Sequence, residues 1–127
     1  IENLSKSFTN FLLKGNKMAI VTVRLKTTQL DAVTVPSNKS YAITNILVCN
    51  NGGAAATFDL HFIPSGNPLD NNITRVINGL SVDAAETFTF DSEKVILSTG
   101  DKVSFVASPD VGSGNTNLSA MISYLEV

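Results

Sequence analysis

The sequence contains few of the residues that catalytic and metal sites most often use. Its 127 residues include one histidine, one cysteine and no tryptophan. A single cysteine cannot form an intrachain disulfide, and one histidine with one cysteine cannot supply the four ligands of a structural zinc site. Without tryptophan, only tyrosine and phenylalanine rings remain for stacking against a sugar. These absences argue against a disulfide scaffold and a zinc site, and they weaken the case for a carbohydrate-binding platform.

Charge is also scarce, because only 16% of the residues are Asp, Glu, Lys or Arg. The formal net charge is -2 at pH 7, and the nine Lys and Arg residues are scattered along the chain. Nucleic-acid binding needs clustered Lys and Arg that displace counterions from phosphates, so no nucleic-acid partner is expected. No apolar run approaches the length of about 20 residues that a membrane span requires, and the N-terminus lacks the apolar region of a signal peptide. We therefore expect neither a membrane partner nor export.

The abundant residues indicate one domain with a largely neutral polar surface. Apolar residues make up 43% of the chain, and Ser, Thr and Asn are frequent. A chain of this length can bury a continuous core without a disulfide or a metal. A surface of neutral polar side chains is common in all-β proteins that pack into larger assemblies.

Residues 1–17, IENLSKSFTNFLLKGNK, differ from the rest of the chain. Four apolar residues recur there at helical spacing: Leu4, Phe8, Phe11 and Leu12. With Gly15 as a C-terminal stop, they predict a short amphipathic helix or arm. An alternative comes from the genetic code, because residues 14–18 back-translate to a purine-rich stretch followed by a start codon, as in a bacterial ribosome-binding site. On that alternative Met18 is the natural start and residues 1–17 are a translated leader.

From Met18 onward the apolar residues recur at every second position, which is the period of a β-strand. Turn residues interrupt the pattern at roughly ten-residue spacing, and no helical segments alternate with the strands. Strands are predicted over residues 18–25, 31–35, 41–49, 55–63, 73–78, 86–90, 95–97, 102–107 and 118–127. The predicted fold is therefore all-β: a single antiparallel β-sandwich over residues 18–127, of jelly-roll or immunoglobulin-like topology, with the short N-terminal helix or arm appended.

Residues 41–63 have the clearest local pattern. Residues 50–53, Asn-Asn-Gly-Gly, tolerate positive φ and separate two apolar stretches, so a hairpin is predicted. Alternation along each predicted strand then gives the side that faces the core. The expected core residues are Val21, Val23, Ile43, Leu47, Phe58, Leu60, Phe62, Phe88, Phe90, Val103, Phe105 and Ile122.

The main candidate for chemistry is the pair Asp59 and His61, which lie two residues apart on the same outward strand face. The carboxylate could orient a ring nitrogen, but no recognisable motif supplies a serine or cysteine nucleophile. We therefore interpret the two residues as a solvent-facing strand pair. Cys49 follows two apolar residues and is interpreted as a buried, unreactive thiol. No enzymatic activity and no catalytic residue are expected.

Two long polar loops, residues 64–72 and 108–117, are the other candidate sites. Asp70 and Asp110 begin stretches rich in Asp and Asn whose oxygens could bind calcium, but neither stretch has EF-hand spacing and turn formation explains both. No metal and no cofactor are expected. The loops could instead bind a surface glycan with help from Tyr41 and Tyr124, although half-buried strand tyrosines are the simpler interpretation.

Two stretches resemble a known family. Residues 33–63, VTVPSNKSYAITNILVCNNGGAAATFDLHFI, are similar to the pattern T-V-P-x-G-K-x-Y-x-I-x-x-I-x-V-x-N followed by a small-residue turn and an alternating strand. That pattern recurs in small virion structural proteins of tailed bacteriophages, including those of marine cyanobacteria. Residues 95–105, VILSTGDKVSF, resemble the L-x-x-G-D-x-V/I strand–turn–strand of the same proteins and of other jelly rolls. Asn38 stands where the family pattern usually has glycine.

The resemblance covers about residues 18–127 and implies a non-enzymatic structural subunit of a phage particle. Such a subunit would be made in the host cytoplasm and located in the virion, as capsid decoration or as a tail or neck component. The implied partners are other virion proteins and further copies of this chain. A homo-oligomer is expected, with a trimer favoured by analogy with phage jelly rolls. A carbohydrate-binding or adhesin-like module with the same fold is the alternative.

Overall fold

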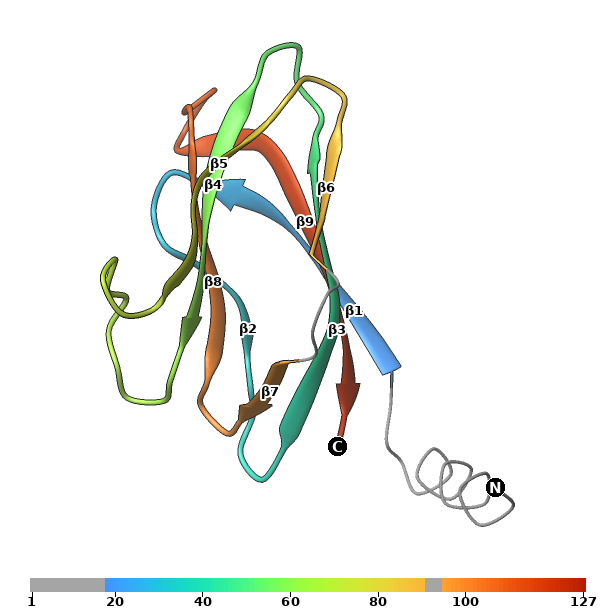
Figure 1. Ribbon diagram of the computed structural model, residues 1–127, viewed down its shortest axis with the longest axis vertical. Coiled ribbons are helices and arrows are strands. Elements are labelled where there is room, and N and C mark those ends of the chain that lie inside the picture. The colour runs from blue at the N-terminus through green and yellow to red at the C-terminus, as the bar shows by residue number, and fades with distance from the viewer. Residues whose placement is uncertain (1–17, 91–94) are drawn as a thin grey trace.

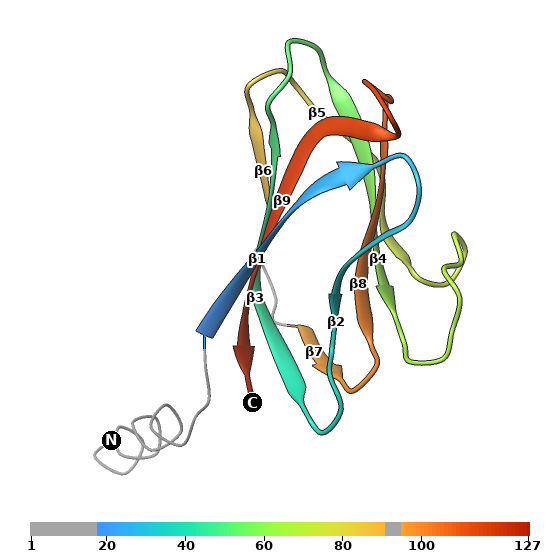
Figure 2. The same ribbon diagram turned by 180° about the vertical axis from the view of Figure 1, so that it is seen from behind.

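The computed structural model describes residues 18–90 and 95–127. In these ranges the chain forms two antiparallel sheets packed face to face and no helix (Figures 1 and 2). The strands are β1 (Met18–Lys26), β2 (Leu30–Thr34), β3 (Ser40–Asn50), β4 (Ala56–Ile63), β5 (Arg75–Val82), β6 (Thr87–Phe90), β7 (Val95–Ser98), β8 (Lys102–Ser108) and β9 (Asn115–Glu126). The predicted all-β sandwich is confirmed. The predicted N-terminal helix, arm or leader lies outside the described residues.

The order of the strands identifies the sandwich as a jelly roll. One sheet has the order β1-β9-β3-β6, with β7 also paired to β3, and the other has the order β2-β8-β4-β5. β7 and β6 pair with the first and second halves of β3, so together they occupy one strand position. Eight positions in two four-stranded sheets form the double Greek key of a jelly roll. An immunoglobulin-like sandwich pairs its first two strands in one sheet, whereas β1 and β2 lie in different sheets here.

Residues 41–63 do not form the predicted hairpin, because β3 and β4 belong to different sheets. Apolar and polar residues alternate along both strands, as they would in a hairpin. Strands in two facing sheets show the same alternation, because each sheet turns one apolar side toward the shared core. The crossing between the sheets is fixed by the buried side chain of Asn50. Its Nδ2 donates to the carbonyl oxygens of Ala54 and Val82, each at 2.9 Å. Its Oδ1 accepts from the N–H of Gly52 at 2.8 Å.

The predicted core residues belong to the apolar cluster between the sheets or pack against it, with the exception of Leu47. A bulge in β3 between Ile43 and Asn45 inserts one residue opposite β9. The extra residue reverses the alternation, so Ile46 and Val48 are buried in the core while Leu47 is half-buried on the other face. The prediction for Leu47 was wrong because it extended a period of two from Ile43 through the bulge.

Candidate functional site

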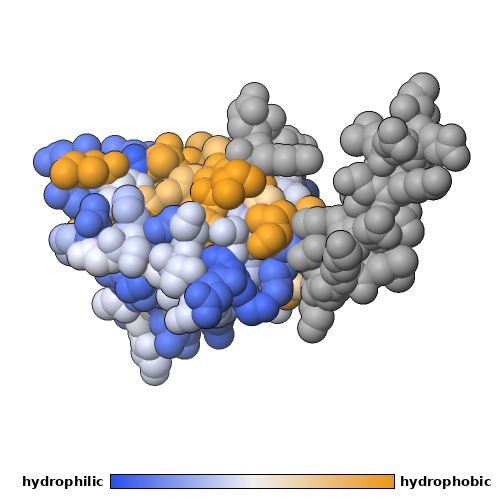
Figure 3. Space-filling model, turned by 90° about the horizontal axis from the view of Figure 1, so that it is seen from below, coloured by the Kyte–Doolittle hydropathy of each residue, from blue (hydrophilic) through white to orange (hydrophobic). Residues whose placement is uncertain are grey.

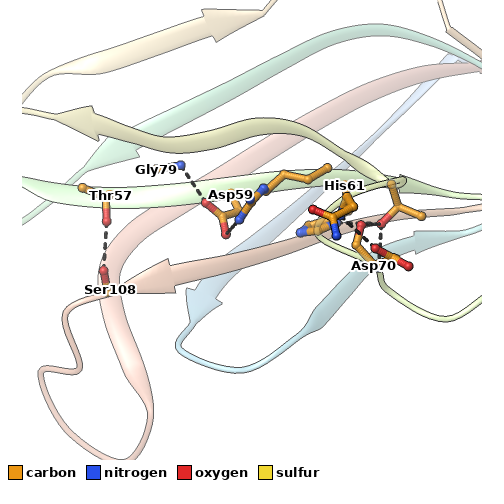
Figure 4. Close-up of polar contacts among 9 residues, drawn as sticks. Thr57, Asp59, His61, Asp70, Gly79 and Ser108 are labelled. Carbon is orange, nitrogen blue, oxygen red and sulfur yellow. Dashed lines mark hydrogen bonds and ion pairs between the residues drawn. The ribbon is translucent and has the colours of Figure 1, made fainter.

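The two outer faces of the sandwich differ in chemistry. We call the outer side of the β2-β8-β4-β5 sheet the polar face and the outer side of the β1-β9-β3-β6 sheet, with β7, the apolar face. On the polar face, most outward side chains of β4 and β8 are polar and bond to one another, as in the 2.9 Å contact between the hydroxyls of Thr57 and Ser108 (Figure 4). Seen from below, hydrophobic surface runs along the upper margin of the view, from the left end to the residues drawn in grey, and the lower part is mostly hydrophilic (Figure 3).

Asp31 is the centre of one polar cluster on the polar face. Its Oδ1 accepts a hydrogen bond from the Ser104 hydroxyl at 2.6 Å and another from the Gln29 amide at 2.8 Å. Its Oδ2 lies 3.4 Å from Nζ of Lys102. Partial burial alone would raise the pKa of Asp31, but these hydrogen bonds and the lysine charge outweigh burial and lower it. The carboxylate is therefore occupied by neighbours in its own sheet.

His61 does not face solvent as predicted, because it is 0% exposed beneath Thr74 at the end of the β4–β5 loop. Nδ1 of His61 lies 2.8 Å from the Thr74 hydroxyl, which donates to the carbonyl oxygen of Asp70 at 3.0 Å (Figure 4). Nε2 of the same ring is buried and has no hydrogen-bond partner among the described residues.

The environment of His61 favours a neutral ring. Burial lowers the pKa of His61, the charge of Asp59 opposes this shift and the charge of Arg75 adds to it. A general base must reach a substrate proton, and a ring nitrogen closed off from the surface cannot do so. The buried ring therefore acts as a structural support for the β4–β5 loop.

Asp59 is engaged separately from His61. Its Oδ1 accepts from the N–H of Gly79 at 2.6 Å, and its Oδ2 lies 3.5 Å from Nη1 of Arg75 (Figure 4). Gly79 has a φ of 60°, a left-handed conformation that suits glycine. The carboxylate thus stabilises an irregular point within β5, which continues to Val82 instead of ending before Gly79 as predicted. Asp59 and His61 therefore contact two different backbone features: Gly79 in β5 and, through Thr74, Asp70 in the β4–β5 loop.

The two long loops lie at opposite ends of the β4–β8 pair, since these strands are antiparallel (Figure 1). They cannot form one site together. Oδ1 of Asp70 accepts from the N–H of Asn72 at 2.8 Å, and Oδ1 of Asp110 accepts from the N–H of Gly112 at 2.7 Å. Both carboxylates thus close turns in their own loops. Within residues 18–90 and 95–127, no three His, Cys, Asp or Glu side chains gather as a metal ion would require.

The candidate sugar-stacking rings stack on each other. The ring centroids of Tyr41 and Tyr124 are 4.2 Å apart with an interplanar angle of 22°. Tyr41 is buried in the core cluster and Tyr124 packs against it, so Tyr41 is deeper than the half-buried position predicted. A cleft of about 310 Å³ at one end of the sandwich is lined by small and apolar residues, including Pro109 and Val111, and its described lining has no aromatic ring.

Cys49 is half-buried on the outer side of β3, so the thiol is less buried than predicted. The bulge that turns Leu47 outward also turns Cys49 outward. Its Sγ donates a weak hydrogen bond to Oδ1 of Asn51 at 3.5 Å. This neighbour is neutral, whereas a reactive thiol is activated by a nearby positive charge.

The apolar face is built from alternate residues of neighbouring strands. The strand register places Met18, Leu125, Ala42 and Ile96 in one row across β1, β9, β3 and β7. Ile20 adjoins this row on β1, whereas Leu47 and Met121 lie beyond a row that contains the polar residues Ser123 and Asn45. Met18, Ile20 and Ile96 are 69%, 67% and 61% exposed. The sequence pattern already predicted that Ile20 and Val21 lie on opposite faces of one strand. Only the pairing of strands distant in sequence shows that the outward residues form one surface.

Among the described residues there is no helix of the length and apolarity that a membrane span requires. No protein-family model matches this chain, and no curated protein matches it. A chain from the acidic stable capsid structure of Helicobacter pylori bacteriophage KHP30 is similar over 87% of this chain and 86% of that chain, with a TM-score of 0.50 and 11% identity. A chain from the crystal structure of the T13 IBDV viral particle is similar over 87% of this chain and 30% of that chain, with a TM-score of 0.42 and 10% identity. The likeness to the phage capsid chain is one of fold, and it agrees with the jelly-roll strand order.

Proposed function

We propose that this protein is a non-enzymatic structural subunit of a bacteriophage particle. The observation that carries the proposal is a jelly roll whose likeness to a phage capsid chain extends over 87% of this chain and 86% of that one. The jelly roll is an architecture of viral capsid domains. The resemblance of residues 33–63 and 95–105 to small phage virion proteins supports the same role independently.

The side chains that could have indicated an enzyme support a structural role. His61 and Asp59 hold backbone features of β4, β5 and their loop. Asp70 and Asp110 close turns in their own loops. A chain with only 16% charged residues suits a subunit that makes extensive apolar and hydrogen-bonded contacts in an assembly.

Within the particle, the subunit is capsid decoration or a component of the tail or neck. Its partners are other virion proteins and copies of itself, because closed symmetric rings are the usual assembly of identical subunits. A trimer is favoured by analogy with other phage jelly rolls, and the resemblance of the sequence points to phages of marine cyanobacteria.

Immunogold electron microscopy of purified particles of the source phage tests this function. An antibody raised against the recombinant protein should label the head, the neck or the tail, and mass spectrometry of the same particles should detect the chain. Particles that lack the protein would contradict a virion role. Light scattering of the purified protein should show an assembly larger than the 13.5 kDa monomer. Saturable binding on a glycan array, together with absence from particles, would favour the adhesin-like alternative.

A further inference from the structure

The apolar face is left uncovered by the described part of the chain. Met18, Ile20 and Ile96 are each more than half exposed there. Contiguous exposed apolar surface on a soluble domain usually marks a contact with another segment or molecule. A surface depression of about 340 Å³ also lies next to the start of β1. It is lined by Met18, Ala19, Ile20, Ser123 and Tyr124.

The segment outside the described residues joins the sandwich inside this face. Residues 1–17 end at Lys17, and the next residue, Met18, is a member of the apolar face. A segment attached at its own docking surface has a high effective concentration and needs no linker to reach it. Gly15 can adopt the left-handed conformation that turns a chain back at the end of a helix.

The composition and length of this segment suit the surface. At helical spacing, Leu4, Phe8, Phe11 and Leu12 share one side, while the opposite side is mostly polar and carries Asn3, Lys6 and Asn10 together with Leu13. A helix over residues 4–14 would be about 16 Å long. The four strand positions of the sheet span about 14 Å between the outermost axes. A helix this short is marginal alone in water, so it requires a surface on which to bury its apolar side.

We propose that residues 1–17 form an amphipathic helix that docks on the apolar face of their own chain. Phe8 and Phe11 contact the surface around Ile20, and the depression beside β1 receives one of the large apolar side chains. The side that carries Asn3 and Asn10 then faces solvent, so docking replaces an apolar outer surface with a polar one. The inference does not depend on the virion role.

Oxidation of the methionines by hydrogen peroxide measures this coverage directly. The chain has two methionines, Met18 and Met121, and both belong to the apolar face. Oxidation of a methionine requires access of the peroxide to its sulfur. Mass spectrometry of the full chain should show slow oxidation at both sites compared with the same chain unfolded in urea. A full-length double variant, Phe8→Asp with Phe11→Asp, should oxidise several-fold faster at both sites.

A matched control separates docking from a simple effect of charge. The double variant Asn3→Asp with Asn10→Asp adds the same two charges on the opposite side of the helix and should oxidise like the unmodified chain. Equal rates for the unmodified chain and the Phe8/Phe11 variant would overturn the proposal and favour the translated-leader alternative. Oxidation that accelerates on dilution would also overturn it, because the cover would then be a second copy.

A second experiment perturbs the surface instead of the segment. Trypsin cleaves after lysine, and the segment carries Lys6, Lys14 and Lys17. The face variant Ile20→Asp with Ile96→Asp should release the segment and increase the rate of cleavage at these lysines several-fold. Substitutions of the exposed polar-face residues Asn78 and Ser81 by Asp should leave the rate unchanged. Equal cleavage in both variants, with circular dichroism confirming that both are folded, would contradict docking.

Discussion

Replacement of Asn50 by alanine tests whether a buried side chain fixes the crossing from β3 to β4. The change removes the two hydrogen bonds from Nδ2 to the carbonyl oxygens of Ala54 and Val82 and the one from the N–H of Gly52 to Oδ1. Those three backbone groups must then find water or remain unpaired. A buried polar group left without a partner costs about 1–3 kcal/mol.

The expected loss follows from how far water can reach each group. Ala54 is exposed and Gly52 is half-buried, so water can replace much of what their backbone groups lose. Val82 is buried, and its carbonyl oxygen bonds Asn50 in the interior. One group that stays unpaired and two that are partly compensated give a decrease of about 2–4 kcal/mol in the free energy of unfolding. That is a large fraction of the roughly 5–15 kcal/mol that stabilises a typical domain.

Urea unfolding followed by circular dichroism measures this loss, with Asn51→Ala as the control. Asn51 is the next residue along the chain, but it is exposed, and its side-chain amide donates to the Ser119 hydroxyl at 3.1 Å and accepts the weak hydrogen bond from Cys49. The control should lose less than about 0.5 kcal/mol, as is usual for surface positions. A loss below about 1 kcal/mol for Asn50→Ala, or equal losses for the two variants, would refute the role assigned to Asn50.

Two further predictions concern a buried ring and a glycine turn. Because burial lowers the pKa of His61, the unfolded chain takes up a proton below about pH 6.5 before the folded chain does, so the free energy of unfolding should fall by up to about 1.4 kcal/mol per pH unit as the pH drops from there. Urea titrations at several pH values should show a shallower dependence in His61→Asn, and identical slopes would contradict this account. Gly100 has a φ of 84°, and a Cβ there would clash with Oγ of Ser65, so Gly100→Ala should destabilise the fold by about 1–3 kcal/mol. Thermal unfolding followed by circular dichroism measures this loss, with Gly53→Ala as the control. A Cβ at Gly53 meets nothing within 4 Å, so that variant should be nearly neutral. Equal melting temperatures for the two variants would exclude strain at Gly100.

The positions of the strands could be predicted from the sequence because alternation is a local property. In β1, Val21 and Val23 pack against the core while Ile20 is exposed, as a period of two requires. Strand pairing is not local, and a segment such as residues 41–63 satisfies a hairpin and a crossing between sheets equally well. The signal that was missed is Asn50, a polar residue on the inward side of a strand end that must find backbone partners.

The candidate sites were harder to predict because each depends on contacts between distant residues. The outward direction of His61 on β4 agreed with the pattern, but its burial comes from Thr74 beyond a long loop. Leu47 was misplaced because no residue type marks the bulge in β3. The apolar face brings together β1 and β7 through β9 and β3, so it could be recognised only after the strand order was known.

The place of β9 in its sheet has a consequence for how the chain folds as it is synthesised. β9 lies between β1 and β3, with Leu125 paired to Met18. While the ribosome still holds β9, β1 and β3 have no neighbour between them and this sheet cannot close. Pairing between such distant segments is slow, and unpaired strand edges are prone to aggregate. This sheet is therefore completed only after β9 has left the ribosome, and until then the edges of β1 and β3 that face β9 stay unpaired.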